Sequence, residues 1–95
     1  MYCVQKKNGV FWYRDSSHTI MHRIGGPAAI FDSGKKVWIV NDKRHRDDGP
    51  ALTWADGTYD WYLDGIYYQA FEDYIKELKK TKSPKEILML KLKYS

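Results

Sequence analysis

The chain has 95 residues, of which 43% are hydrophobic and 29% are charged, a composition typical of one ordinary globular domain. Its apolar runs are far shorter than the roughly 18 residues of a membrane helix; its first residues lack the apolar core of a secretory signal, and its one cysteine cannot form an internal disulfide. These features exclude a disulfide-stapled secreted scaffold, a membrane-spanning protein and a large multi-domain enzyme. They favour a location in the cytoplasm.

Residues 1–21 are predicted to form an N-terminal hairpin. Asn8-Gly9 is a strong tight-turn signal, and the segments on both sides, residues 2–5 and 10–13, suit β-strands. We interpret this region as a degenerate copy of the units that follow, because terminal repeats are commonly atypical.

A repeat with a period of 23 residues covers residues 22–68. It preserves His22-Arg23 as His45-Arg46, Gly26-Pro27-Ala28 as Gly49-Pro50-Ala51, Gly34 as Gly57 and Trp38 as Trp61. Each unit predicts a hairpin: residues 28–31 and 36–40 are strand-like and flank a glycine turn, and residues 51–54 and 58–63 repeat this plan. In the last of these strands, alternation places Tyr59, Trp61 and Leu63 on one face.

Residues 69–95 change to a helical period. Phe71, Tyr74, Ile75 and Leu78 predict one helix, and Ser83-Pro84-Lys85-Glu86 is a capping box that opens a second. Helices this short need tertiary contacts, so we expect both to dock on the hairpins. The predicted fold class is therefore mainly β with α: a stack of three antiparallel hairpins in one domain, capped by two short C-terminal helices.

The segment 38–45 resembles the MORN repeat, because Trp38, Asn41, Lys43 and His45 match that family's pattern while Asp42 stands in place of its glycine. The next unit keeps Trp61 and Gly65 but has Ile66 and Tyr68 in place of the Lys and His. The closest likeness is to a His-Arg-x-x-Gly-Pro-Ala variant found in small proteins of bacteriophages and bacteria, and it covers residues 22–65.

The resemblance implies a non-catalytic binding role. MORN repeats mediate protein contacts and have been linked to membrane lipids, and MORN-like repeats occur in some bacterial antitoxins. Together with the small size, this leads us to expect a phage-encoded inhibitor or modulator of a host defence protein, or an antitoxin-like binder, in the host cytoplasm. The expected partner is a host or cognate protein, and a homo-oligomer is left open.

Two interpretations of the His-Arg pairs are open. Arg23 and Arg46 can lie over neighbouring Trp rings or pair with Asp47 and Asp48, which would hold adjacent hairpins in register. Alternatively, the stacked copies form a ridge that grips acidic groups of a partner. The structural interpretation is favoured, since a residue that recurs in every unit usually serves the stack.

Exposed aromatic residues and arginines are the candidates for partner binding, because recognition surfaces are rich in Trp, Tyr and Arg. The candidate residues are Trp12, Arg23, Trp38, Arg46 and Tyr62.

Single-stranded nucleic-acid binding is the alternative function. Most of the net charge of +4 lies in residues 70–95, which hold seven lysines and four acidic residues. The candidate residues are Lys76, Lys79, Lys80 and Lys82. A solvated helix face explains the same lysines, and attachment to an anionic membrane surface is a third possibility.

No catalytic, cofactor or metal site is predicted. His18 and His22 are four residues apart with Cys3 as a conceivable third ligand, but the segment between them is not helical in character. Asp47 and Asp48 are adjacent on an extended segment and point to opposite faces, so they are poorly placed to act as paired carboxylates.

Overall fold

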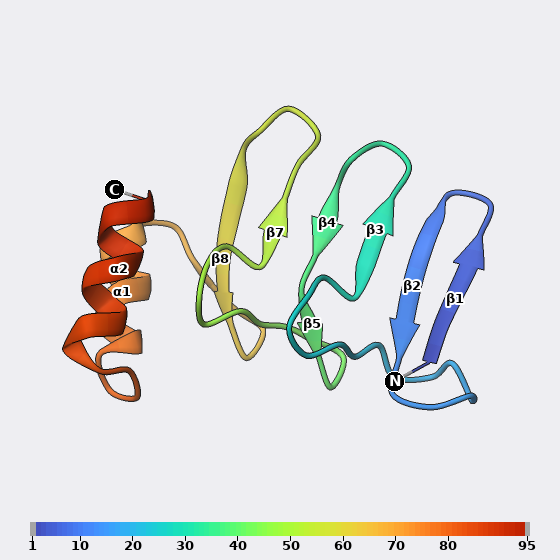
Figure 1. Ribbon diagram of the computed structural model, residues 1–95, viewed down its shortest axis with the longest axis horizontal. Helices are drawn as coiled ribbons and strands as arrows, with labels where there is room; N and C mark the ends of the chain where they lie inside the picture. The colour runs from blue at the N-terminus through green and yellow to red at the C-terminus, as the bar shows by residue number, and fades with distance from the viewer. Residues whose placement is uncertain (1, 95) are drawn as a thin grey trace.

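The protein, described here by a computed structural model for residues 2–94, is mostly antiparallel β-sheet with two short helices at its C-terminal end (Figure 1). The hairpins stand in a row along the longest dimension of the molecule, and the helices lie beyond the last hairpin. The predicted fold class is confirmed. The elements are β1 (Tyr2–Lys6), β2 (Gly9–Tyr13), β3 (Ala29–Phe31), β4 (Lys36–Val37), β5 (Ile39–Val40), β6 (Lys43–Arg44), β7 (Leu52–Thr53), β8 (Tyr59–Leu63), β9 (Ile66–Tyr68), α1 (Phe71–Leu78) and α2 (Pro84–Tyr94).

One sheet runs through all three hairpins in the order β1-β2-β3-β4-β7-β8-β9, and β5 and β6 form a small second sheet. A straight row of apolar side chains crosses five strands, because neighbouring strands pair them in register. The row consists of Val4, Phe11, Ala29, Val37 and Leu52. All but Val4 are at most 9% exposed, so this row is the centre of the hairpin core.

The 23-residue sequence repeat is also a repeat of main-chain hydrogen bonds. The Phe31 N–H donates to Lys35 and the Trp54 N–H to Thr58, at 2.9 and 2.8 Å, closing equivalent turns. Gly34 and Gly57 in these turns have φ of 102° and 91°, a conformation that glycine adopts without the cost a side chain would impose. The two units therefore share one backbone conformation, as the period predicts.

The predicted single strand at residues 36–40 is wrong, since the chain changes sheet in its middle. Lys36–Val37 belong to β4 of the large sheet, whereas Ile39–Val40 form β5. Trp38 lies between them: its N–H donates to Ala51 at 2.7 Å and its carbonyl accepts from His45 at 3.0 Å. Its main chain thus bonds to two different segments, and a continuous strand cannot form there.

The two helices form as their sequences predict and cover the last hairpin. In α2 the Ser83 hydroxyl accepts the Glu86 N–H at 3.3 Å, which is the expected capping contact. A second core joins both helices to β8 through its Trp61 and Leu63 side. The helix side chains in this core are Tyr74, Ile75, Leu78, Ile87 and Leu90.

Candidate interaction surface

Both histidines of the repeated His-Arg pair are anchored to the fold in the same way. The Nδ1 atoms of His22 and His45 accept the main-chain N–H groups of Asn41 and Asp64, each at 3.0 Å. Asn41 and Asp64 have φ of 48° and 50°, so each histidine secures a tight left-handed turn. These side chains have a structural role at both positions.

The arginines and tryptophans form what we call the Trp–Arg layer, made of Trp12, Arg23, Trp38 and Arg46. The Arg23 guanidinium lies 4.0 Å from the Trp12 ring centroid, and that of Arg46 lies 4.1 Å from the Trp38 centroid. Each arginine also donates to the carbonyl oxygen of the proline four residues later, at 3.1 Å. Arg46 pairs in addition with Asp48 at 2.9 Å. Each guanidinium thus connects one unit to the ring of the unit before it.

The invariant glycine of each unit makes room for the arginine. A Cβ on Gly26 would lie 2.8 Å from Arg23 Cζ, and a Cβ on Gly49 would lie 2.7 Å from Arg46 Cζ. Both are closer than carbon atoms can approach without one of them moving. The spacing of arginine and glycine in the motif is therefore a packing requirement.

The third tryptophan of the series is covered by the helices. Trp61 is 5% exposed, and its ring centroid lies 4.6 Å from Tyr74, 4.9 Å from Phe71 and 5.3 Å from Tyr94. These rings cover Trp61 as the arginines cover the first two tryptophans, so the helices take the place that a further unit's arginine would have.

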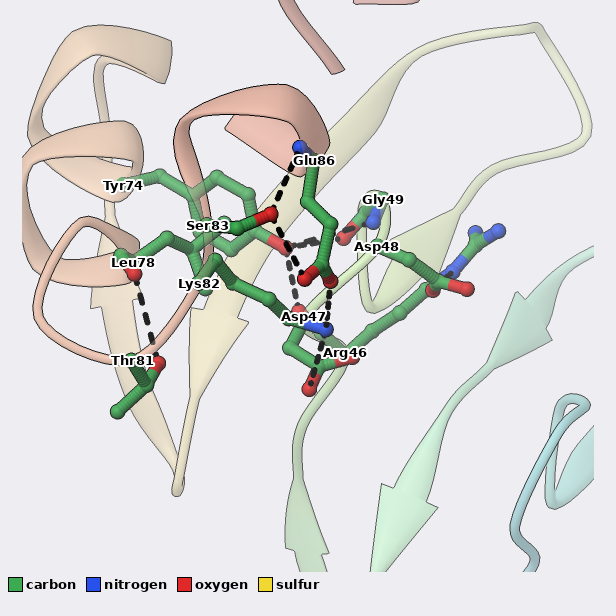
Figure 2. Close-up of polar contacts among 10 residues, drawn as sticks. All are labelled: Arg46, Asp47, Asp48, Gly49, Tyr74, Leu78, Thr81, Lys82, Ser83 and Glu86. Carbon is green, nitrogen blue, oxygen red and sulfur yellow. Dashed lines mark hydrogen bonds and ion pairs between the residues drawn. The ribbon is translucent and has the colours of Figure 1, made fainter. Parts of the chain in front are cut away.

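Polar contacts fasten the helices to the second unit (Figure 2). The buried Tyr74 hydroxyl lies 2.5 Å from the carbonyl oxygen of Arg46 and 3.0 Å from that of Gly49, and it accepts the Gly49 N–H at 3.4 Å. Burial raises the pKa of Tyr74, so the hydroxyl stays protonated and can donate. This contact fixes the loop that carries the Arg46 side chain.

Lys82 joins the same loop to α2 (Figure 2). Its Nζ lies 3.2 Å from Asp47 and 3.2 Å from Glu86. Burial alone would lower the pKa of Lys82, but the hydrogen bonds to Glu86 and Asp47 outweigh it and the pKa is raised. The hydrogen bond from Lys82, followed by that from Ser83, lowers the pKa of Glu86. Both charged forms are therefore stabilised by the contact.

The four candidate nucleic-acid lysines are not equivalent. Lys82 is held by Asp47 and Glu86, and Lys80 pairs with Glu77 at 3.0 Å. Lys76 and Lys79, in contrast, line a groove of about 410 Å³ between α1 and α2 together with Phe71. Of the four candidate lysines, therefore, only Lys76 and Lys79 form no ion pair with an acidic residue among residues 2–94.

Tyr62, the fifth partner-binding candidate, lies on the opposite face of β8 from Trp61 and outside the Trp–Arg layer. Its ring centroid is 5.4 Å from that of Tyr67, its register partner on β9, and 5.3 Å from Arg44 Cζ. Tyr67 is 51% exposed, and no carboxylate among residues 2–94 forms an ion pair with Arg44. We call Arg44, Tyr62 and Tyr67 the aromatic–basic cluster.

Sequence reasoning missed Arg44 and Tyr67, because they stand at one repeat position whose residue type changes. Met21, Arg44 and Tyr67 are successive residues 23 apart. A search for identical positions overlooks such a site. The signal that could have found it is a repeat position that is exposed in the hairpin and differs between units.

The residues considered above for metal binding or catalysis each have contacts of their own. Cys3 is exposed on β1, and the His18 ring stacks 5.0 Å from Tyr13. Asp47 contacts Lys82 and Asp48 contacts Arg46, so the two carboxylates are engaged separately. Among residues 2–94, no three His, Cys, Asp or Glu side chains gather as a metal site would require.

Comparisons of the chain with protein-family models, with curated proteins and with solved structures found no match. In the part of the chain that the structure describes, neither helix has the length and apolar character needed to cross a membrane.

Proposed function

We propose that the chain is a non-catalytic protein-binding module whose recognition surface is the aromatic–basic cluster. The observation that supports this is a contrast between the arginines. Arg23 and Arg46 donate hydrogen bonds to carbonyl oxygens of the fold. Arg44 forms no ion pair within residues 2–94, and its side chain is exposed beside two tyrosines. Exposed arginine and tyrosine side chains dominate the binding energy of many interfaces.

The position of the cluster in the repeat supports the same proposal. Identical positions of the unit, such as His45 and Arg46, serve contacts that every unit needs. Positions that differ between units, such as Arg44 and Tyr67, are released from that constraint and can be specific to one partner. The partner would offer carboxylates to Arg44 and an apolar surface to the tyrosine rings.

The form of this function that we favour is a small inhibitor or antitoxin-like modulator that acts on a host or cognate protein. It rests on the resemblance to MORN-like repeats and on the size of the chain. The experiment is capture by the tagged chain from an extract, identification of the bound protein by mass spectrometry, and titration calorimetry with the purified partner.

Arg44→Ala and Tyr67→Ala should each weaken binding by about 10-fold or more, the loss typical of a central interface residue. The matched control is Trp54→Ala, because Trp54 is also an exposed aromatic residue, 42% exposed, but follows β7 at the other end of the hairpin. Unchanged affinity in both cluster variants, or equal loss in the control, would show that the cluster is not the recognition surface.

Single-strand nucleic-acid binding is the second candidate, supported by the groove that Lys76 and Lys79 line beside Phe71. Lysine contacts to phosphates are one element of such sites, although Glu72 also lines this groove and the Phe71 ring packs against Trp61. A gel shift at low salt tests it: a complex that weakens steeply with salt and is lost in Lys76→Ala/Lys79→Ala supports this function. The absence of any complex removes it.

A further inference from the structure

The outer edge of β1 has free main-chain groups. The N–H of Trp12 donates to Ala28 at 2.8 Å, on the side of β2 that faces β3. Cys3, which is the register partner of Trp12, therefore sits at a pair that exchanges no hydrogen bonds, and its N–H and C=O point out of the sheet. Gln5 lies two residues further on and has the same orientation. No strand among residues 2–94 pairs with this edge.

The apolar row of the hairpin core ends at this edge as well. Val4 continues the row that begins with Leu52 and runs through Phe11, but Val4 is only half-buried whereas Phe11 is 9% exposed. Every other member of the row has apolar neighbours on both adjacent strands or packs inside the core. A further strand alongside β1 would bury Val4 and extend the row.

The two ends of the row of hairpins differ, and this decides which occupant fits. At the far end, α1 packs against β8 and β9, and Tyr68 and Trp61 lie against its Tyr74 ring. The strand at that end, β9, has three residues, so it is a poor match for the five of β1. A head-to-tail row of copies is therefore disfavoured, while two β1 edges match each other in length and direction.

We propose that the chain forms a two-fold dimer in which β1 of each copy pairs with β1 of the other, making one continuous antiparallel sheet. With the axis beside Val4, Val4 faces Val4 of the second copy. Cys3 and Gln5 of the two copies then oppose each other and exchange both main-chain hydrogen bonds. In this register Tyr2, which is 45% exposed, lies opposite Lys6 of the second copy. A pairing of this kind is isologous and closed, so assembly stops at the dimer.

The test is the mass of the 95-residue chain in solution, measured by light scattering after size exclusion over a concentration series. The unmodified chain should approach twice the chain mass at high concentration. Cys3→Pro should remain monomeric, because proline removes an outward N–H that the hairpin itself does not use and is tolerated at such edge positions. The matched control is Cys3→Ser, which changes the side chain and keeps the N–H, and it should dimerise like the unmodified chain.

A second variant keeps the proposal testable if Cys3→Pro fails to fold. Gln5→Cys places a thiol opposite Cys3 of the second copy, at a pair whose Cα atoms lie about 5.5 Å apart and so within disulfide reach. Mild oxidation should then give a covalent dimer on a non-reducing gel, and Cys3→Ser/Gln5→Cys should not. An unmodified chain that stays monomeric at every concentration overturns the proposal and leaves the edge to a strand of a different protein. The β1 edge and the aromatic–basic cluster lie on different strands, so either proposal can fail without the other.

Discussion

The Trp–Arg layer and the aromatic–basic cluster contain the same kinds of side chain and use them differently. In the layer, each guanidinium lies about 4 Å from a tryptophan ring, at 4.0 and 4.1 Å, and its donors are used by proline carbonyls of the same unit. In the cluster, Arg44 lies 5.3 Å from Tyr62, and its side chain is exposed beside Tyr67. The layer is engaged within the fold. In the cluster, Tyr62 packs against the hairpin core, whereas Arg44 and Tyr67 are exposed to solvent.

This difference teaches that residue type alone does not locate a binding surface in a repeat protein. Arginine beside an aromatic ring has a favourable contact energy in both places. What separates the two sets is whether the remaining donors are used inside the chain. Substitutions in the layer should therefore act on stability, and substitutions in the cluster should act on binding.

The largest loss of stability is expected at Trp61, the last tryptophan of the series that begins with Trp12 and Trp38. Trp61→Ala should destabilise the protein by about 3–5 kcal/mol, the usual cost of deleting a buried aromatic side chain. Trp61 is 5% exposed and touches rings from both helices, so its loss leaves a cavity in the helix-covered core. The measurement is the free energy of unfolding in denaturant.

The matched variant for this experiment is Tyr67→Ala in the cluster. Tyr67 is 51% exposed, so its removal should change the free energy of unfolding by no more than about 0.5 kcal/mol. A large loss of stability in Tyr67→Ala would mean that the cluster is part of the core and would break the distinction drawn above.

A smaller effect is expected from the close approach of Gly26 and Arg23. Gly26→Ala should force the guanidinium away from Trp12 and from the Pro27 carbonyl, so it should cost about as much as Arg23→Ala, on the order of 1–2 kcal/mol. Once the arginine is absent, the added methyl group no longer meets the Arg23 side chain. The double variant should therefore cost no more than either single one.

The measurement is a double-mutant cycle on the free energy of unfolding. Additive costs would contradict the packing explanation, because they would mean that the glycine is needed for a reason unrelated to the arginine. Gly25→Ala does not serve as a control here, since Gly25 has φ of 84° and any side chain there is strained.

Much of the fold was predictable from the sequence, because its strongest signals are local or periodic. The spacing of His45, Arg46 and Gly49 already indicated a structural unit, and the Ser83–Glu86 capping box correctly marked the start of α2. The break at Trp38 was not predictable, because it depends on hydrogen bonds to Ala51 and His45 that belong to the tertiary structure.

The candidate site was less accessible to sequence reasoning. Trp12, Arg23, Trp38 and Arg46 have the residue types of a recognition surface, and only the geometry shows that their contacts lie within the fold. The only sequence signal for Arg44 is its place in the repeat, 23 residues from both Met21 and Tyr67, where the residue type changes. Its approach to Tyr62 depends on the tertiary structure, in which β5 and β6 form a small sheet separate from the one that contains Tyr62.

The smallest expected effect concerns the contact of Lys82 with Asp47 and Glu86, which ties the helices to the loop behind Arg46. The pKa of Glu86 is lowered below its ordinary 4.5, so the stability it contributes is present above that pH and is lost as the pH falls through the lowered value. The pKa of Lys82 is raised above its ordinary 10.5, so its contribution is present below that pH and is lost as the pH rises through the raised value.

The test is Lys82→Met, which keeps most of the side-chain stem and removes the charge. The thermal midpoint of the unmodified chain should therefore exceed that of Lys82→Met on the plateau between these limits, and the two should converge in acid and in alkali. Lys80→Met is the control, because Lys80 follows the end of α1 and, within residues 2–94, pairs only with Glu77 of that helix, so this pair does not join two parts of the fold. A gap between the unmodified chain and Lys82→Met that persists in acid would mean that the lysine stem, and not its charge, holds the helices to the second unit.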